Sequence, residues 1–263
     1  MNERELTGRV ALVTGAGSGI GRATALLFAR QGAAVGLLGR TESELQDVAQ
    51  EIQQQQGRSH VLLADVADAA AVQRAVEQLV RQFQRLDIVF ANAGVNGVWA
   101  PIEELSPEDW QKTLAINLSG TFYTIKYAVP HLKRAGGSVI VCASVNGTRM
   151  FSNTGASAYA STKAAQAALV KMLAVELGPQ RIRVNVVCPG AIETEIDDNT
   201  TRQHLERVGR PVEFPQGSIP LTGRTPGKPE QVAEVVLFLA SDRSSHVSGT
   251  ELWVDGAQSL LQG

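Results

Sequence analysis

Tyr159 and Lys163 are the residues of this sequence whose types and spacing most directly suggest proton transfer. They lie in an Ala- and Leu-rich segment that predicts a helix, with Ser157 as its N-cap and Gly178-Pro179 as its stop signal. Residues four apart share a helix face, so the ammonium would lie near the phenol. A free phenol titrates near pH ~10, and a neighbouring positive charge lowers that pKa. The pair therefore suggests a general acid and base, although ordinary solvated helices carry the same spacing.

The elements that must position this pair follow from the hydrophobic pattern. Apolar, β-branched runs alternate with amphipathic segments along the whole chain. Such alternation is typical of a doubly wound α/β fold, in which helices cover both faces of a parallel sheet. We expect Pro130 to kink or end its long helix early. The expected strands are 9–14, 34–38, 60–64, 86–91, 138–143, 183–187 and 252–254, and the expected helices besides that of Tyr159 are 21–31, 41–56, 69–83, 107–134 and 230–240.

Length and composition limit the class of protein. With 263 residues, 44% hydrophobic and 19% charged, we expect one domain, 1–263, around a sizeable core. A net charge of −2 without Lys/Arg runs argues against nucleic-acid and membrane-surface binding, so the partner should be a small molecule. Cys142 and Cys188 lie in apolar runs and predict buried free thiols. Because there is no membrane-length apolar run and the first residues are polar, we expect a cytoplasmic protein.

The segment 191–228 is the one long irregular stretch, and we expect it to be a substrate-binding loop. The four histidines show no metal-ligand spacing among themselves or with the cysteines, so no metal site is expected. We expect a mostly apolar pocket for a ketone or secondary alcohol, without a carboxylate clamp. Its candidate lining residues, which could equally be ordinary packing residues, are Trp99, Arg149, Met150, Phe151, Ile196 and Phe214.

A glycine-rich turn follows the first expected strand, where doubly wound folds bind phosphate. Its glycines are Gly15, Gly19 and Gly21 in useful spacing, and Ile20 stands where the common dinucleotide fingerprint has its last glycine. These glycines can still provide what phosphate binding requires: a tight turn, a backbone that a pyrophosphate can approach, and helix amides that point at an anion.

Six motifs in order resemble the short-chain dehydrogenase/reductase family, from Gly8 to Gly256. They are Thr14–Gly21, Asn92-Ala93-Gly94, Asn117, Ser144, Tyr159 with Lys163, and Pro189-Gly190. The resemblance implies a Rossmann-like fold with a seven-stranded parallel sheet, a nicotinamide dinucleotide and no metal. The family's usual pair of asparagines before Ala-Gly is Ala91-Asn92 here, and the second asparagine is kept.

The resemblance also implies roles for four catalytic candidates. Tyr159 would exchange the hydroxyl proton, and Lys163 would lower the phenol pKa and bind the nicotinamide ribose. Ser144 would polarise the substrate carbonyl, and Asn117 would hold a water that relays protons toward Lys163. From the residues alone, Ser144 could equally be a cap or turn residue at a strand end, and Asn117 a solvated or capping asparagine.

The end of the second expected strand bears on cofactor choice. NAD-specific folds place an acidic residue there, which would repel a 2′-phosphate, and this chain has Gly39 followed by Arg40 and Thr41. A guanidinium binds phosphate well, so we expect NADP(H). Arg40 could equally be a solvated residue. Many NADP-preferring relatives also have a basic residue in the glycine turn at the place where this chain has Ser18. The expected cofactor contacts are Gly15, Ser18, Gly19, Ile20, Gly21, Arg40, Thr41, Asp65, Val66, Asn92, Ala93, Gly94, Tyr159, Lys163, Pro189, Gly190, Ile192 and Thr194.

These observations predict an NADP(H)-dependent oxidoreductase that interconverts a ketone or aldehyde and an alcohol. A 3-oxoacyl-thioester reductase of fatty-acid synthesis would share every motif. A dinucleotide-binding protein without catalysis is the third possibility, which would have no need of an activated phenol. The small alanines on several faces of the Tyr159 helix permit close helix approach, and relatives that this chain resembles commonly pair these helices. We therefore expect a homotetramer, with a dimer as second choice.

Overall fold

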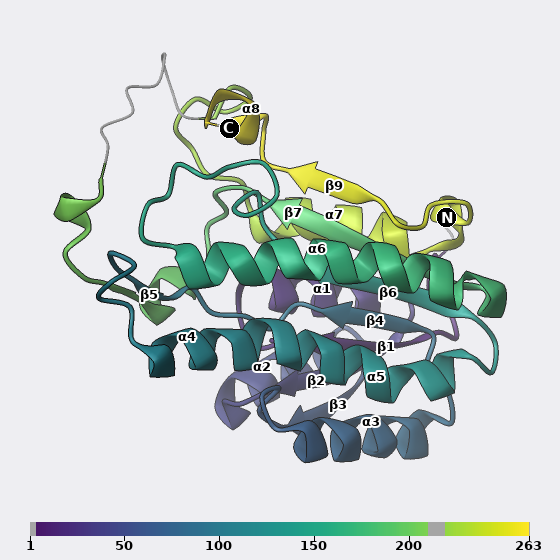
Figure 1. Ribbon diagram of the computed structural model, residues 1–263. Coiled ribbons are helices and arrows are strands. Elements are labelled where there is room, and N and C mark those ends of the chain that lie inside the picture. The colour runs from purple at the N-terminus through teal and green to yellow at the C-terminus, as the bar shows by residue number, and fades with distance from the viewer. Residues whose placement is uncertain (1–3, 210–218, 263) are drawn as a thin grey trace.

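Seven parallel strands form the central sheet of the computed structural model, which describes residues 4–209 and 219–262 (Figure 1). The strand order β3-β2-β1-β4-β6-β7-β9 reverses direction between β1 and β4, which is where ligands of such sheets bind. The predicted doubly wound, seven-stranded fold is confirmed. The strands are β1 (Val10–Thr14), β2 (Ala34–Gly39), β3 (Arg58–Leu63), β4 (Ile88–Ala91), β6 (Gly137–Cys142), β7 (Ile182–Pro189) and β9 (Glu251–Val254).

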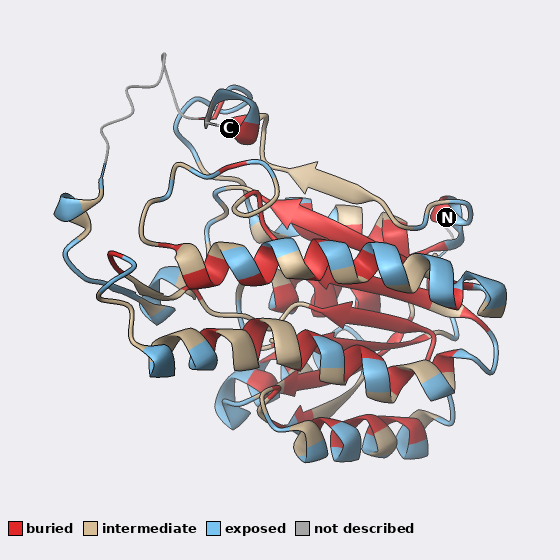
Figure 2. Cartoon of the chain, in the orientation of Figure 1, coloured by how far each residue is buried: buried red, intermediate tan, exposed pale blue. Residues whose placement is uncertain are grey.

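Helices cover both faces of this sheet. Two separate hydrophobic cores result, one under α3, α5 and α6 and the other under α1, α2 and α7. The inner strands β1, β2, β4, β6 and β7 are buried on both sides, which explains their near-continuous apolar sequences, whereas the edge strands β3 and β9 are more exposed (Figure 2). The helices are α1 (Gly19–Arg30), α2 (Glu42–Gln54), α3 (Ala69–Phe83), α4 (Pro107–Leu114), α5 (Gly120–Leu132), α6 (Ser157–Leu177), α7 (Pro229–Ala240) and α8 (Gln258–Gln262).

The helix expected over 107–134 is divided. A π-helical turn, Ala115–Ser119, separates α4 from α5, and Asn117 lies in that turn. Pro130 has no N–H for the carbonyl four residues before it, and α5 ends two residues later, at Leu132. The prediction of Ser157 as an N-cap is wrong, since Ser157 is already the first helical residue and Ala156 precedes it without a side-chain cap bond.

A two-stranded parallel sheet, which the sequence did not predict, joins the loop after β4 to the loop after β7. It pairs β5 (Gly97–Trp99) with β8 (Thr200–Arg202). Beside it, Glu104 accepts hydrogen bonds from Arg207 and contacts His204 at 2.6 Å. The described part of the loop 191–228 is therefore held against the segment before α4. None of the helices described here is long and apolar enough to cross a membrane.

Candidate active site

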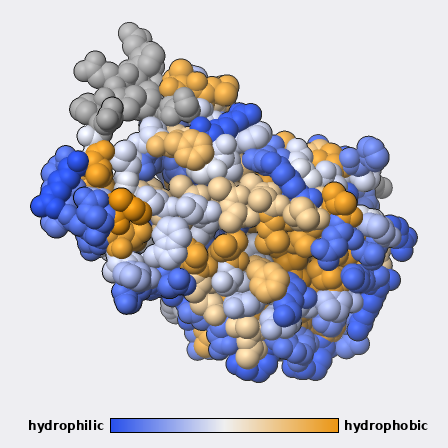
Figure 3. Space-filling model, viewed as in Figure 1, coloured by the Kyte–Doolittle hydropathy of each residue, from blue (hydrophilic) through white to orange (hydrophobic). Residues whose placement is uncertain are grey.

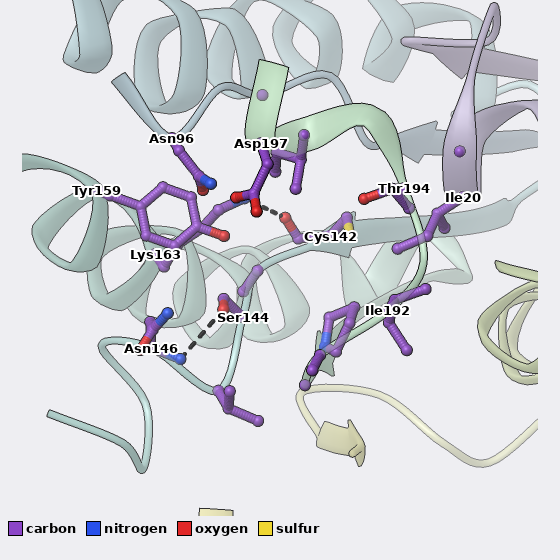
Figure 4. A pocket seen from close by; sticks show the side chains of 18 of the residues that line it. Ile20, Asn96, Cys142, Ser144, Asn146, Tyr159, Lys163, Ile192, Thr194 and Asp197 are labelled. Carbon is purple, nitrogen blue, oxygen red and sulfur yellow. Dashed lines mark hydrogen bonds between the residues drawn. The ribbon is translucent and has the colours of Figure 1, made fainter. Parts of the chain in front are cut away.

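A cavity of about 450 Å³ opens at the carboxyl edge of the sheet, where β1, β4, β6 and β7 end (Figure 4). It brings together residues that lie far apart in the sequence. Those predicted as site residues and found in its lining are Gly15, Ser18, Gly19, Ile20, Asn92, Ala93, Gly94, Ser144, Tyr159, Lys163, Pro189, Gly190, Ile192 and Thr194. The lining thus combines the expected dinucleotide motif with the expected proton-transfer group.

The glycine turn forms one end of the cavity. Gly15 and Gly19 have positive φ angles of 64° and 48°, which other residues adopt only at a cost. Gly21 packs so closely that an added Cβ would lie 2.0 Å from the Gly15 carbonyl oxygen. Ser18 precedes α1 without a side-chain cap bond, so the first-turn N–H groups have no capping side chain. The turn therefore has the open backbone that an anionic pyrophosphate needs.

The loop after β4 is fixed to this turn. The Thr14 hydroxyl oxygen accepts hydrogen bonds from the backbone N–H groups of Asn92 and Ala93, both at 3.0 Å. The Asn92 side chain donates in return to the Thr14 carbonyl at 3.0 Å. These bonds explain the position of the Asn92-Ala93-Gly94 motif beside the glycines.

Ser144, Tyr159 and Lys163 face one another on the other side of the cavity. Ser144 follows β6, while Tyr159 and Lys163 project from the first turns of α6. The Lys163 Nζ lies 5.4 Å from the centre of the Tyr159 ring and donates to the Cys142 carbonyl at 2.8 Å. All three side chains are buried. The geometry is that of a proton donor beside a hydroxyl that can hold a carbonyl oxygen.

The expectation that Lys163 lowers the phenol pKa is wrong for this geometry. Burial raises the pKa of Tyr159 to about 12, and the hydrogen bond with Ser144 opposes this only in part. Burial also lowers the pKa of Lys163. The physical reason is that both charged forms lose water, while the ammonium is bonded to a backbone carbonyl and not to the phenol. Tyr159 is therefore a protonated acid at neutral pH.

Asn117 is fully buried and holds the loop after β4. Its Oδ1 accepts from the Val95 N–H, and its Nδ2 donates to the Val95 carbonyl, each at 2.9 Å. The π-helical turn gives its backbone carbonyl two further donors, Gln166 Nε2 and Thr121 Oγ1, both at 2.7 Å. An added Cβ on Gly94 would lie 3.2 Å from Asn117 Oδ1 and 3.6 Å from Lys163 Nζ. Asn117 thus lies behind the cavity, next to Lys163.

Five of the expected cofactor contacts are outside the cavity lining. Arg40 and Thr41 follow β2, and Arg40 NH1 lies 4.0 Å from Asp65 Oδ2 at the end of β3. Val66 is buried against Gly120 of α5. These residues continue the same edge of the sheet away from Tyr159. The five are Gly21, Arg40, Thr41, Asp65 and Val66.

The candidate pocket residues divide into three groups. Trp99, Met150 and Ile196 line the cavity, but Arg149 and Phe151 do not. The Arg149 guanidinium stacks 3.5 Å from the centre of the Trp253 ring, and Phe151 is 72% exposed. The remaining candidate, Phe214, lies outside the described residues.

The lining mixes polar and apolar residues, whereas a mostly apolar pocket was expected. Several of its polar residues belong to none of the sequence motifs. They are Asn96, Asn146, Asn153, Glu195, Asp197, Asn199 and Gln258. Gln258 of α8 accepts from the Ala191 N–H at 2.8 Å and so holds the start of the loop after β7. No local signal marks these positions, since they come from four separate segments.

Two other expectations concern metals and thiols. In residues 4–209 and 219–262, no three His, Cys, Asp or Glu side chains are grouped as metal ligands. Cys142 and Cys188 are free and buried, as predicted, and burial raises the pKa of both thiols.

Known proteins match almost the whole chain. A model of the family described as enoyl-(acyl carrier protein) reductase matches residues 15–257. The 3-oxoacyl-(acyl-carrier-protein) reductase FabG of Thermotoga maritima is 37% identical over 252 residues, 95% of this chain and 98% of that protein. A solved structure described as a 3-ketoacyl-ACP reductase from Sinorhizobium meliloti 1021 is 55% identical, with 96% of this chain and 99% of that chain covered and a TM-score of 0.93.

The third match carries a ligand in its description. The structure of carveol dehydrogenase from Mycobacterium avium in complex with NAD is 32% identical, covers 97% of this chain and 99% of that chain, and has a TM-score of 0.86. The family model extends from the glycine turn through the Tyr159 helix to β9, the last strand of the central sheet. The chain belongs to the short-chain dehydrogenase/reductase family of oxidoreductases.

Proposed function

We propose that this protein is an NADP(H)-dependent oxidoreductase that interconverts a ketone or aldehyde and an alcohol. The observation that carries the proposal is the convergence of Ser144, Tyr159 and Lys163 on the cavity that the glycine turn also lines. A protein that only binds a dinucleotide has no need of a buried phenol at that place.

The residues fit a nicotinamide dinucleotide. A side chain at Gly19 would fill the space under Thr194, whose Cγ2 lies 3.0 Å from the position of an added Cβ. The α1 amides, the Asn92-Ala93-Gly94 segment and the Pro189-Gly190 segment would hold the dinucleotide, which supplies a hydride when bound.

In the reduction, the chain's residues handle the oxygen and its proton. The Ser144 hydroxyl would donate to the substrate carbonyl oxygen and orient it. As hydride reaches the carbonyl carbon, the C=O π electrons move to oxygen, which takes the proton from the Tyr159 hydroxyl. Lys163, anchored on Cys142, would hold the nicotinamide ribose beside Tyr159. In the oxidation of an alcohol the same proton returns to Tyr159.

The preference for NADP(H) is part of the proposal and is supported by two adjacent residues. Gly39 ends β2 without an acidic side chain, and the Arg40 side chain is 54% exposed beside it. At 4.0 Å the contact with Asp65 is loose, so the guanidinium can turn toward a 2′-phosphate.

A 3-oxoacyl thioester is the alternative substrate, and the descriptions of the Thermotoga and Sinorhizobium relatives favour it. The loop 191–228 would bind either substrate. A panel of ketones, aldehydes, alcohols and 3-oxoacyl thioesters, followed by nicotinamide absorbance with NADPH and with NADH, tests the proposal. Reduction of at least one class with a preference for NADPH is expected. Dinucleotide binding without turnover across the panel would favour the binding-only alternative.

We also propose that the protein is a homotetramer, with a dimer as second choice, in a reducing cytoplasm that keeps both cysteines as thiols. Apolar side chains gather on the face formed by α5 and α6 (Figure 3). Phe122, Met172 and Val175 are 46%, 71% and 80% exposed there, more than an isolated chain needs. Light scattering at micromolar concentration should give the mass of a tetramer, and a monomer mass would refute the assembly.

A further inference from the structure

Besides Asn92 and Gln258, four side-chain amides line the same cavity as the Tyr159 hydroxyl, although hydride transfer itself needs none of them. They reach it from three directions: the loop after β4, the loop between β6 and α6, and the loop after β7. In Figure 4 the side chains of Asn96 and Asn146 lie on either side of the Tyr159 ring. The four amides are Asn96, Asn146, Asn153 and Asn199.

Hydrogen bonds hold three of these side chains, Asn96, Asn146 and Asn153, and leave some of their amide groups for a ligand. An amide offers two N–H donors and one oxygen. Asn153 donates to Asn146 Oδ1 at 3.0 Å, while the Asn146 side-chain NH₂ bonds to no described residue. The Asn146 backbone N–H donates to Ser144 Oγ at 3.1 Å, so the backbone of residue 146 lies next to the hydroxyl that would hold the carbonyl. Asn96 donates to Thr200 Oγ1 at 2.8 Å, and its own side-chain oxygen accepts from none of the residues that the structure describes.

The charges around this end of the cavity disfavour an anion. Among the described lining residues, Lys163 is the one lysine or arginine, and its ammonium is bonded to a backbone carbonyl. Asp197 also lines the cavity, and one of its oxygens is paired with Arg202 at 3.0 Å. The other lining carboxylate, Glu195, lies toward the glycine turn, where its Oε2 is 3.7 Å from the position of an added Cβ on Gly19. Carboxylates and phosphates are bound in proteins by arginine or lysine donors. A keto acid would meet the Asp197 carboxylate here.

The size of the cavity points to a small molecule. Its volume of about 450 Å³ must also take the nicotinamide end of the dinucleotide. Trp99, Met150 and Ile196 supply the apolar part of the lining, against which the C–H groups of a short carbon chain can pack. The rest of the lining offers hydrogen bonds.

We propose that the substrate is a small, uncharged, polyhydroxylated ketone or the corresponding polyol. Asn146 and Asn153 hydrogen-bond the hydroxyl groups next to the reacting carbon, and Asn96 accepts from a hydroxyl on the other side of the Tyr159 ring. This inference rests on the proposed carbonyl/alcohol activity and narrows its substrate class against the thioester alternative.

The test compares compounds matched in carbon number on the full chain with NADPH and with NADH. Erythrulose is the polyhydroxylated ketone, 2-butanone its apolar counterpart and 2-oxobutanoate its anionic counterpart, with acetoacetyl-coenzyme A as the thioester. We expect kcat/KM for erythrulose to exceed that for each of the others by at least about 10-fold. Higher efficiency with 2-butanone, 2-oxobutanoate or the thioester overturns the inference while leaving the oxidoreductase proposal intact.

Single substitutions test which side-chain amides cause the preference for erythrulose. Asn146→Leu and Asn153→Leu keep the approximate side-chain volume and remove the amide, so each should lower kcat/KM for erythrulose by about 3- to 10-fold. The values for 2-butanone should stay within about 2-fold of the parent. Gln53→Leu, an exposed change on α2, is the matched control and should alter kcat/KM for neither erythrulose nor 2-butanone. Equal losses with both ketones would contradict a role in hydroxyl recognition.

Binding is measured separately from turnover. Saturation-transfer NMR with erythrulose should show contact with the parent protein and a weaker signal with Asn146→Leu. If no compound is reduced but this pattern is found, the proposed activity fails and the ligand class stands. If erythrulose does not bind the parent protein, with or without dinucleotide, the ligand class is wrong.

Discussion

Lys163 donates from its ammonium to the Cys142 backbone carbonyl at 2.8 Å, and this bond ties α6 to the end of β6. Ser144 lies two residues beyond Cys142, so the lysine fixes the distance between the two hydroxyl groups of the site. The lysine therefore has a positioning role in addition to its charge. Its bond to a carbonyl also explains why it does not depress the phenol pKa, which burial raises to about 12.

The raised pKa gives the first prediction. The chain has three tyrosines, so a difference titration of tyrosinate absorbance between the parent protein and Tyr159→Phe isolates one phenol. Because its pKa is raised, the Tyr159 hydroxyl should stay protonated as the pH rises through ~10, where free phenols ionise. The step should be centred near its own pKa of about 12. A difference step centred below pH ~10 would show that the ammonium outweighs burial.

Thr148 gives the second prediction. Its hydroxyl donates to the Ser144 carbonyl at 2.7 Å and accepts from Trp253 Nε1 at 3.2 Å, linking the Ser144 loop to β9. Thr148→Val removes both bonds, and we expect kcat to fall by about 3- to 10-fold with little change in dinucleotide Kd. Thr148→Ser keeps the hydroxyl and should restore kcat. A similar loss in both variants, or an unchanged kcat in Thr148→Val, would exclude a positioning role.

Arg40 gives the third prediction. A hydrogen bond to a charged group contributes ~1.5–3 kcal/mol, so Arg40→Ala should weaken NADPH binding by roughly 10- to 150-fold and leave NADH binding almost unchanged. Gly39→Asp should act in the same direction because a carboxylate repels the 2′-phosphate. Fluorescence titration with both dinucleotides measures each Kd. Equal weakening of both, or better efficiency with NADH in the parent protein, would show that the preference is not for NADP(H).

The central sheet and the residues around Tyr159 were predictable because their signals are local. Each strand buried on both faces is an apolar run in the sequence, and a four-residue spacing fixes Tyr159 and Lys163 on one face of α6. Ser144 was predictable for a similar reason, since it directly follows such a run at the edge where ligands bind.

The remaining features depend on contacts between distant segments. β5 and β8 are three residues each and pair across about a hundred positions, so neither carries a local signal. Asn146, Asn153 and Gln258 belong to the cavity only because the fold brings their loops together. The phenol pKa was predicted in the wrong direction because burial cannot be read from the spacing of two residues.

The measurement that tests the account most directly is the turnover of Tyr159→Phe, with whichever substrate of the panel the parent protein uses best. The variant loses one hydroxyl, the proposed proton donor, and its ring still fills the same buried space. We predict that kcat falls at least ~100-fold while the dinucleotide Kd, measured by fluorescence titration on the same preparation, changes less than about 2-fold. Turnover near the parent value would contradict the assignment of Tyr159 as the general acid and base.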